Sequence, residues 1–391
     1  MNNEKNQSKK PIYKYILIIF LTAFVSLAVA FVSIYFWISF DTRYFKLKQL
    51  DFFLNDFYGE IDEQNIEDGI IRGYLSALGD KYAGYYTAKE NEDRSNRLNG
   101  NASGIGIIIV EHPQNNTIYV KRVYNDSPAA KAGIKETDEI LAIDGISVVE
   151  KGYSDSVDNL LREIGSTVEL LILRNGEKIS LSVEYSNFKA QSVFGKMMGD
   201  IGYIEITSFN TESITQFENT VNSLVSKGAK GLIFDLRGNG GGTVESVTEI
   251  LDFLMPKGTI MTVKYGDGRT ETYAQSDASE IELPMAVLVD ENTASASELF
   301  SATVRDFNKG VLIGTTTYGK DVMQSTYQFT DGSAAVFTIA EFFSHSGESF
   351  NGKGLVPDIV VELTEEQKTN FHILSDEADP VKQAAIEWMN K

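Results

Sequence analysis

The sequence predicts a multidomain α/β chain: an N-terminal transmembrane helix, a helical segment, a small β domain and an α/β core with a mixed or parallel sheet. Three observations support this prediction. Residues 15–40 contain no charged side chain, and short β runs with glycine-containing turns fill residues 104–187. Beyond these, buried apolar strands alternate with helical stretches, as in parallel β–α–β units. We expect five parts: a cytoplasmic tail (1–14), a transmembrane anchor (15–40), a helical segment (41–97), the β domain (98–187) and the α/β core (188–391).

Composition narrows the classes of function. The chain has 391 residues, 42% hydrophobic and 23% charged, which is typical of a globular protein of two or three domains. Its formal net charge is −20, and all of the acidic excess lies after residue 40, because residues 1–40 carry four lysines and one glutamate. Such a charge argues against nucleic acid as a partner. The absence of cysteine excludes thiol catalysis, cysteine zinc sites and disulfides.

The uncharged stretch 15–40 is long enough to cross a bilayer as a helix, which takes about 20 apolar residues. A buried core helix is the alternative. Ala28-Val29-Ala30 resembles a signal-peptidase site, but the apolar run continues beyond it, which favours an uncleaved anchor. Four lysines precede the stretch and three basic residues follow it, so the positive-inside rule favours a cytoplasmic 1–14 by a narrow margin. The body would then lie on the extracytoplasmic side of the cell membrane.

The next segment, 41–97, shows apolar residues at three- and four-residue spacing in LKQLDFFLNDFYGEI and IEDGIIRGYLSALG. This spacing predicts amphipathic helices. Two roles remain open for them: a local helical cap, or a module that forms a homodimer through 41–97.

Residues 98–187 contain five short β runs, the hairpin signal RNGE and two short helical stretches, SPAAKAG and SDSVDNLLREIG. The run Gly104-Ile105-Gly106-Ile107, followed by SPAAKAGIKETDEILAIDG, closely resembles bacterial PDZ domains. The resemblance implies that N–H groups of this run bind a peptide C-terminal carboxylate while the peptide adds a strand to the sheet edge. Arg162, placed at the end of the second helix, either senses that peptide or is simply solvated. Thr137 stands where many such domains have glycine.

Two loops follow buried strands in the core. RGNGGG follows GLIFDL (231–236), and ENTASAS follows PMAVLVD (284–290). Because ligands bind at the carboxyl ends of parallel strands, we expect the two loops to face one another there. RGNGGG lacks the Gly-Lys-Ser/Thr of a phosphate loop, but its N–H groups suit a developing negative charge.

Ser295 and Glu298 form the pattern of a helix capping box, which by itself explains the serine. The alternative is a nucleophile, since a helix N-terminus suits an oxyanion. Lys320 lies 25 residues further on, and a helix of about 18 Å followed by a returning strand brings it back to the same edge. A lysine is a base near neutral pH only when burial lowers its pKa. We expect Tyr318 and Val322 to supply that apolar pocket; otherwise Lys320 is a solvated turn residue.

Three motifs resemble those of the C-terminal processing (tail-specific) serine peptidases, over residues 45 to 362: DLRGNGGG, TASASELFSATVRDFNKGVLIGTTTYGKDVMQ and DGSAAVFTIAEFFSHSGESFNGKGLVPDI. The resemblance implies that Ser295 is the nucleophile, Lys320 its general base and Gln324 the residue that orients the lysine. It implies an oxyanion hole made by the N–H groups of Gly241 and Ala296. It further implies a membrane-anchored endopeptidase that recognises free C-termini of exported proteins through its PDZ domain and uses no cofactor.

One departure concerns Asp321, where the family usually has glycine. A carboxylate beside Lys320 would stabilise the ammonium, unless an extended backbone turns the two side chains to opposite faces. A PDZ scaffold with a weak or inactive core is therefore one alternative function. A Ser–His hydrolase that uses His345 is another. His112 and His372 show no metal-ligand spacing, and we expect no metal.

Overall fold

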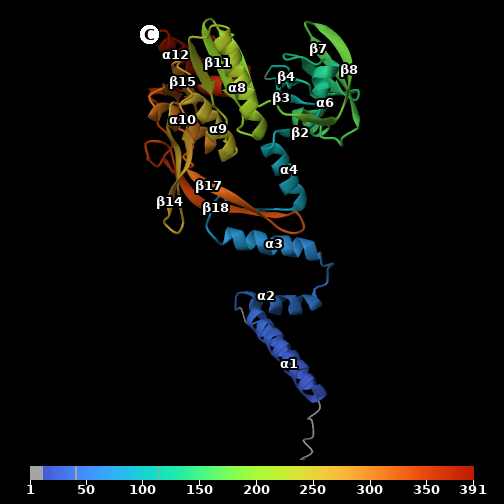
Figure 1. Cartoon of the computed structure of the whole chain (residues 1–391). Helices are drawn as coiled ribbons and strands as arrows, with labels where there is room; N and C mark the ends of the chain where they lie inside the picture. The colour runs from blue at the N-terminus through green and yellow to red at the C-terminus, as the bar shows by residue number, and fades with distance from the viewer. Residues whose placement is uncertain (1–11, 40–41, 113) are drawn as a thin grey trace, which may run out of the picture. The chain divides into compact units, whose positions relative to one another are not determined.

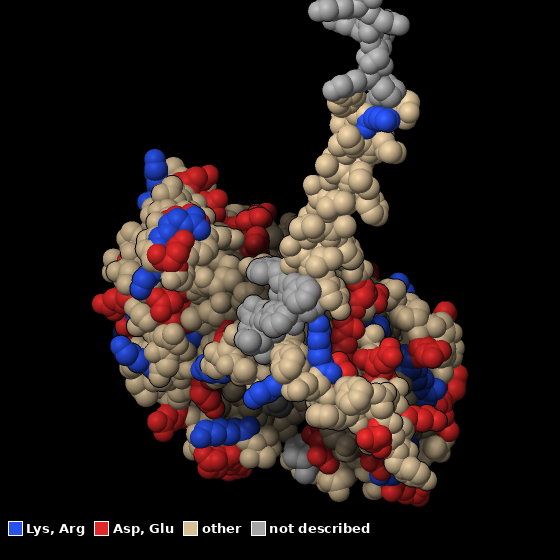
Figure 2. Space-filling view, turned by 90° about the horizontal axis from the view of Figure 1, so that it is seen from below, with Lys and Arg blue, Asp and Glu red and all other residues tan. Residues whose placement is uncertain are grey.

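The computed structural model describes residues 12–39, 42–112 and 114–391, in two compact units, Met1–Glu67 and Asp68–Lys391. Most of the predicted cytoplasmic tail and the end of the predicted span lie outside these residues. Helix α1 (Ile12–Ser39) contains a stretch, Tyr13–Tyr35, that is long and apolar enough to cross a membrane, with mean hydropathy 2.7. Figure 2 shows this helix nearly without charge, whereas acidic and basic side chains are interspersed over the rest of the face in view.

The segment predicted to be helical contains three α-helices and a 3-10 turn, but it also contains a strand. Strand β1 pairs antiparallel with β18, with Tyr85 opposite Ala335. Tyr85 is buried against Leu75 and Ala335, so this segment supplies a strand to a core sheet because its aromatic side chain has an apolar site there. The bounds are α2 (Thr42–Phe53), η1 (Leu54–Asp56), α3 (Glu63–Ser76), β1 (Gly84–Tyr86) and α4 (Ala88–Leu98).

The β domain is a sheet in the order β3-β4-β5-β7-β8, with β6 paired to β5 and a separate β2–β9 pair at its base. Strand β3 is an edge strand, as peptide addition requires. The RNGE turn joins β7 to β8 with positive φ at Asn175 and Gly176, which confirms the predicted hairpin. The bounds are β2 (Asn101–Gly104), β3 (Ile107–Glu111), β4 (Ile118–Val123), α5 (Pro128–Ala132), β5 (Glu139–Ile143), β6 (Ile146–Ser147), β7 (Thr167–Arg174), β8 (Glu177–Glu184) and β9 (Ser186–Lys189).

The second helix of this domain is shorter than predicted. It is α7 (Tyr153–Asp158), which ends seven residues before the end of the predicted stretch 154–165. Another short helix, α6 (Val148–Lys151), precedes it across Gly152, whose φ is 91°. Arg162 therefore lies beyond the helix and not at its end, which corrects the sequence prediction. Its side chain donates to the carbonyl oxygens of Asn159 and Thr167 and thereby holds an irregular connection to β7.

The core contains the predicted parallel sheet, in the order β10-β11-β12-β15-β16-β19, with only β10 antiparallel to its neighbour. Helices α8, α9 and α10 pack on one face through a large apolar cluster, and α12 covers the other face (Figure 1). The bounds are β10 (Val193–Met198), β11 (Ile201–Ile206), α8 (Thr211–Ser226), β12 (Gly231–Asp235), α9 (Val244–Leu254), β15 (Met285–Val289), α10 (Ala296–Asp306), β16 (Gly310–Gly314), β19 (Ile359–Val360) and α12 (Pro380–Met389).

A second, antiparallel sheet has the order β1-β18-β13-β14, with β17 paired to β18. Strand β17 follows Lys320 directly, so this sheet positions the segment of the predicted base. The bounds are β13 (Gly258–Tyr265), β14 (Thr270–Ser276), β17 (Val322–Gln328) and β18 (Ala334–Phe343), with α11 (Glu365–Thr369) and η2 (Phe371–Ile373) near the C-terminus.

Candidate active site

The two loops predicted to face one another are joined by hydrogen bonds. The N–H of Gly238 donates to the Asp290 carboxylate at 2.9 Å, and the Thr293 hydroxyl donates to the carbonyl of Leu236 at 2.9 Å. The N–H of Ala294 donates to the carbonyl of Asn239 at 3.1 Å. Because β12 and β15 are adjacent and parallel, the loops that leave their carboxyl ends meet, as the sequence predicts.

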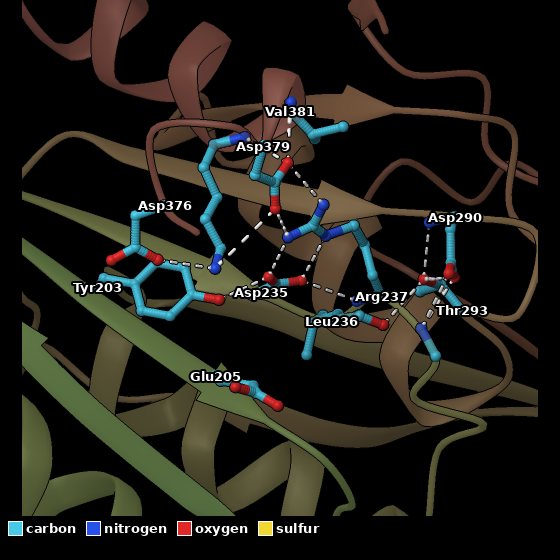
Figure 3. Close-up of polar contacts among 12 residues, drawn as sticks. Tyr203, Glu205, Asp235, Leu236, Arg237, Asp290, Thr293, Asp376, Asp379 and Val381 are labelled. Carbon is cyan, nitrogen blue, oxygen red and sulfur yellow. Dashed lines mark hydrogen bonds and ion pairs between the residues drawn. The ribbon is translucent and has the colours of Figure 1, made fainter. Parts of the chain in front are cut away.

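A buried ion-pair network holds the base of the glycine-rich loop (Figure 3). Arg237 pairs with Asp235 at 2.5 Å and with Asp379 at 2.8 Å, and all three side chains are nearly inaccessible. Burial by itself would raise the pKa of the Asp235 carboxyl, but Arg237 and the Tyr203 hydroxyl hold it below its ordinary value. The network therefore fixes the residue from which RGNGGG departs, and α12 contributes to it through Asp379.

Ser295 has φ 58° and ψ −117°, a conformation that non-glycine residues rarely adopt. Other N-cap residues of this chain, such as Ser127, Asn210 and Thr243, have the extended conformation usual at that position. The predicted capping box is present, with the Glu298 carboxylate accepting the Ser295 N–H at 2.9 Å. Capping alone does not need a strained serine, and such strain gathers at functional sites. A sharp strand-to-helix turn of this kind exposes a nucleophilic oxygen in other hydrolases.

The predicted oxyanion donors lie together beside Ser295. A Cβ atom on Gly241 would come within 2.8 Å of the Ala294 carbonyl and 3.0 Å of the Ala296 nitrogen, so only glycine fits there. Ala296 is the first residue of α10, and its N–H has no partner within the helix. The Gly241 N–H donates to the Asn239 side chain at 2.9 Å. One of the two predicted donors is therefore engaged within the loop itself.

Glu298 connects the serine to the lysine. Its Oε2 accepts the N–H of Ser295 at 2.9 Å and the N–H of Lys320 at 2.8 Å. Its Oε1 accepts the Thr317 hydroxyl at 2.5 Å and the N–H of Gly319 at 2.6 Å. This carboxylate is fully buried, and burial raises its pKa against the opposing effect of these hydrogen bonds. The out-and-back path predicted for the chain therefore returns the Lys320 backbone to Ser295.

The Lys320 side chain is partly buried, and that burial lowers its pKa, as a neutral amine near physiological pH requires. The aromatic ring over its amine belongs to Tyr82, at 4.5 Å from the ring centroid, and not to Tyr318 as predicted. Tyr318 is about half exposed, so it does not supply the predicted apolar cover, while Val322 is buried as expected. Among the described residues, no hydrogen bond joins the Lys320 amine to the Ser295 hydroxyl. Gln324 donates to the Val322 carbonyl at 3.0 Å and to Thr338 at 3.4 Å, not to Lys320.

Asp321 is turned away from Lys320. Its buried carboxylate accepts the Ser349 hydroxyl at 2.6 Å and the N–H groups of Phe350 and Asn351 at 3.1 and 3.0 Å. Adjacent side chains on an extended backbone point to opposite faces, which is the arrangement that the sequence left open. The geometry therefore removes the objection that Asp321 raises to Lys320 as a base.

The peptide-carboxylate residues predicted for the β domain lie at the start of the edge strand. Gly104 and Gly106 have φ of 136° and 81°, and a Cβ on Gly106 would clash with Ser127. Arg162 forms an ion pair with Asp144 and bonds nearby carbonyls, so its cation has a partner within the domain. Because Arg162 is already paired, it does not offer an unpaired cation to the carboxylate of a bound peptide.

The histidines form no catalytic arrangement in the part of the chain that the structure describes. The Nδ1–H of His345 donates to the Thr259 carbonyl at 3.1 Å, and its ring lies against Phe307, which ends the helix that Ser295 begins. The eleven residues of that helix span about 16 Å. His112 lies near Glu139, and the described residues contain no group of side chains able to hold a metal ion. The Ser–His interpretation is therefore not supported by the fold.

A groove of about 830 Å³ is lined by α4, by residues at the starts of α8 and α9, and by β17. Thr243, two residues after Gly241, lines it together with Thr326 and Gln328 of β17 and residues of α4. Sequence reasoning missed this groove because its walls come from segments far apart in the chain. The sequence also led us to interpret Glu298 only as part of a helix cap. Its position three residues after Ser295 was the available signal that it lies beside the candidate nucleophile.

Comparison with known proteins identifies the class. The models for "Peptidase family S41" and "PDZ domain" match residues 200–361 and 103–185. The chain is 32% identical over 335 residues to the carboxy-terminal processing protease CtpA of Bacillus subtilis, over 85% of this chain and 72% of that protein. It is 28% identical to a "Probable CtpA-like serine protease" of Staphylococcus aureus, over 81% of this chain and 64% of that protein.

A solved structure assigned to the same family, from Bacteroides fragilis, shares the fold with a TM-score of 0.57 at 17% identity, covering 82% of this chain and 90% of that one. Fold and matches together define a serine peptidase that carries a PDZ domain. The chain belongs to peptidase family S41, among the serine-type carboxyl-terminal processing peptidases. This confirms the resemblance and the enzyme class predicted from the motifs.

Proposed function

We propose that this protein is a membrane-anchored endopeptidase that cleaves exported proteins with a Ser295–Lys320 dyad. The observation that carries the proposal is the shared oxygen of Glu298, which binds the backbone N–H groups of both residues. The strained φ of Ser295 and the lowered pKa of Lys320 support the same assignment. In this reaction Lys320 accepts the hydroxyl proton as the serine oxygen bonds to the scissile carbonyl carbon. The acyl-enzyme forms when the scissile C–N bond breaks and the amine leaves with that proton, and water then hydrolyses the acyl-enzyme.

The N–H groups of Gly241 and Ala296 are proposed to hold the oxyanion. For Gly241 this requires its N–H to turn from Asn239 to the substrate oxygen, a local change of one peptide group. Gln324 is proposed to orient the lysine after a side-chain rotation, since its amide now bonds Val322 and Thr338. The described geometry is thus that of a resting enzyme whose catalytic contacts tighten with substrate bound.

The edge strand β3 and the glycines before it are proposed to bind a free C-terminus, with the peptide as an added strand. Gly104, Ile105, Gly106 and Ile107 provide the run of backbone groups. The 830 Å³ groove is proposed to hold part of the substrate chain, because Thr243, two residues after Gly241, lines it. Helix α1 is proposed as the anchor, with the peptidase on the extracytoplasmic side and residues 41–97 available for dimer contacts.

The test is a pH–rate profile for cleavage of an unfolded protein with an apolar C-terminus. We expect Ser295→Ala and Lys320→Ala each to abolish cleavage at every pH. If either variant cleaves the substrate at the wild-type rate, the proposed Ser295–Lys320 dyad is rejected. Peptide binding without cleavage by the wild type would instead favour the PDZ scaffold.

A further inference from the structure

The turn before β1 lies against the predicted general base, although it is outside both regions that the family models match. The Lys320 amine lies over the face of the Tyr82 ring, 4.5 Å from its centroid. At this distance an ammonium is attracted by the negative face of an aromatic ring. Nothing in the periodicity of 41–97 distinguishes this tyrosine from the others of the segment.

Asp80 fixes that tyrosine. One carboxylate oxygen of Asp80 accepts the Tyr82 N–H at 2.9 Å, and the other accepts the N–H of Thr338 in β18 at 2.8 Å. The Thr338 hydroxyl in turn accepts the Gln324 amide at 3.4 Å. The turn is therefore pinned to the same strand that borders the lysine segment.

We propose that Asp80 and Tyr82 are positioning residues of the catalytic base, which stabilise the ammonium that forms when Lys320 takes the serine proton. The proposal rests on the proposed function, because it assigns a partner to the same lysine. Both residues act through Lys320 and need not touch the substrate.

The chemistry explains why such a partner is needed. Burial favours the neutral amine before the reaction, but it also penalises the ammonium that appears as the Ser295 O–H bond breaks and the new bond to carbon forms. A carboxylate and a ring face offset that penalty where the charge develops. The base then titrates closer to the working pH, at which general-base catalysis is most efficient.

Some of the charged groups around Lys320 raise its pKa and others lower it. The carboxylates of Asp80 and Glu298 raise its pKa, whereas burial, which is the largest effect, and the cations of Lys81 and Arg94 lower it. Lys81 is exposed and lies 4.8 Å from the centroid of the same Tyr82 ring. Removing the Asp80 charge should therefore lower the pKa of the base and leave the other four influences in place.

The experiment measures kcat/KM against pH for the full chain in detergent micelles, with an unfolded protein as substrate. In this profile the acid limb is the range in which kcat/KM rises with pH. We expect Asp80→Asn to move the acid limb to lower pH by about half a unit or more, and to lower kcat/KM at the plateau by about threefold or more. Asp80→Glu keeps the charge and should restore the limb toward the wild type. Asp93→Asn is the matched control, because it removes an equal charge from the exposed face of α4, where Asp93 pairs with Lys89.

A second pair of variants tests the ring and does not depend on Asp80. Tyr82→Leu keeps an apolar cover but removes the ring face, and should also move the limb to lower pH. Tyr82→Phe keeps the ring and should leave the limb unchanged. It should melt at or above the wild-type temperature, because the Tyr82 hydroxyl is buried without a hydrogen-bond partner among the described residues.

Acid limbs that stay in place, or move to higher pH, in folded Asp80→Asn and Tyr82→Leu variants would overturn the inference. If melting shows that Asp80→Asn is unfolded, the comparison of Tyr82→Leu with Tyr82→Phe decides alone. Lys320→Ala is measured beside them. Full activity of Lys320→Ala would reject the dyad itself, whereas an inactive Lys320→Ala with unmoved limbs would reject only the role of Asp80 and Tyr82.

Discussion

The N–H of Lys320 donates to the Glu298 carboxylate at 2.8 Å, across 22 residues of sequence. This contact ties the segment of the predicted base to the first turn of the helix that begins at the predicted nucleophile. The same carboxylate accepts three further donors, so that each of its oxygens accepts two, in a fully buried position. Its loss should therefore affect both stability and the spacing of the segments that carry Ser295 and Lys320.

We expect Glu298→Gln to lower kcat by about tenfold or more with little change in KM. The amide offers one acceptor oxygen, so either the Ser295–Lys320 pair of donors or the Thr317–Gly319 pair loses its partner. Each buried unsatisfied donor costs about 1–3 kcal/mol, so the melting temperature should also fall. Glu291→Gln, which removes an exposed carboxylate near the same loops, is the control and should change neither quantity. An unchanged kcat in a folded Glu298→Gln variant would contradict the positioning role.

The buried amine of Lys320 predicts a pH-dependent stability. Because burial lowers its pKa in the folded chain, the unfolded chain binds more protons at any pH between the lowered value and the ordinary value near 10.5. The wild type should therefore gain stability as pH rises through that window. Lys320→Met lacks this dependence and should melt above the wild type by the largest margin at the low-pH end of this window, with the margin shrinking as the pH rises toward 10.5. Lys227→Met, at an exposed helix end, should show a constant margin.

Asp321 is expected to matter for stability and not for the base. Asp321→Ala removes the acceptor of the Ser349, Phe350 and Asn351 donors, and should destabilise by about 2–4 kcal/mol. Asp321→Asn keeps one acceptor oxygen for those donors and should cost less. Because the side chain faces away from Lys320, the acid limb of the pH–rate profile should not move in the asparagine variant. A limb displaced to lower pH would show that the carboxylate does act on the lysine.

Thr137 is expected to carry backbone strain that a glycine at the same position would not have. Its φ is 73°, a left-handed conformation that is costly for a β-branched residue and free for glycine. Thr137→Gly should stabilise the PDZ domain by about 1 kcal/mol after the entropy of glycine is subtracted, as measured by urea unfolding. Thr137→Ala keeps a Cβ and serves as the control, with a smaller effect. A loss of stability on Thr137→Gly would show that the threonine side chain contributes more than its backbone costs.

The pairing of Asp379 with Arg237 predicts that α12 supports the glycine-rich loop. Asp379→Ala removes one of the two carboxylates around a buried guanidinium and the N-cap of α12. Breaking a buried pair costs about 3–5 kcal/mol, so we expect a large fall in melting temperature and a lower kcat. Asp376→Ala, whose partners are the lysines Lys196 and Lys382 and not Arg237, should cost less. Equal losses in the two variants would contradict the special role of Asp379.

Local signals in the sequence predicted much of this fold. The positive φ values at Asn175 and Gly176 follow from the turn chemistry of RNGE, and the unbroken apolar runs became the buried parallel strands. The second helix of the β domain was predicted too long, because α7 ends at Asp158 whereas the predicted stretch runs from 154 to 165, and a periodic pattern does not locate such an end. Strand β1 was missed because its apolar site is on β18, about 250 residues away.

The sequence by itself determined the apolar N-terminal helix, the order of the domains and the edge of the sheet where Ser295 and the glycine-rich loop meet. These follow from hydrophobic period, turn residues and the geometry of parallel strands, all of which act locally or along the whole sheet. Only the tertiary structure decided that Glu298 binds the backbone of both Ser295 and Lys320, that Asp321 points away from Lys320 and that Tyr82 covers its amine. Side-chain direction and burial arise when distant segments pack together, and no spacing along the chain specifies which of them will meet.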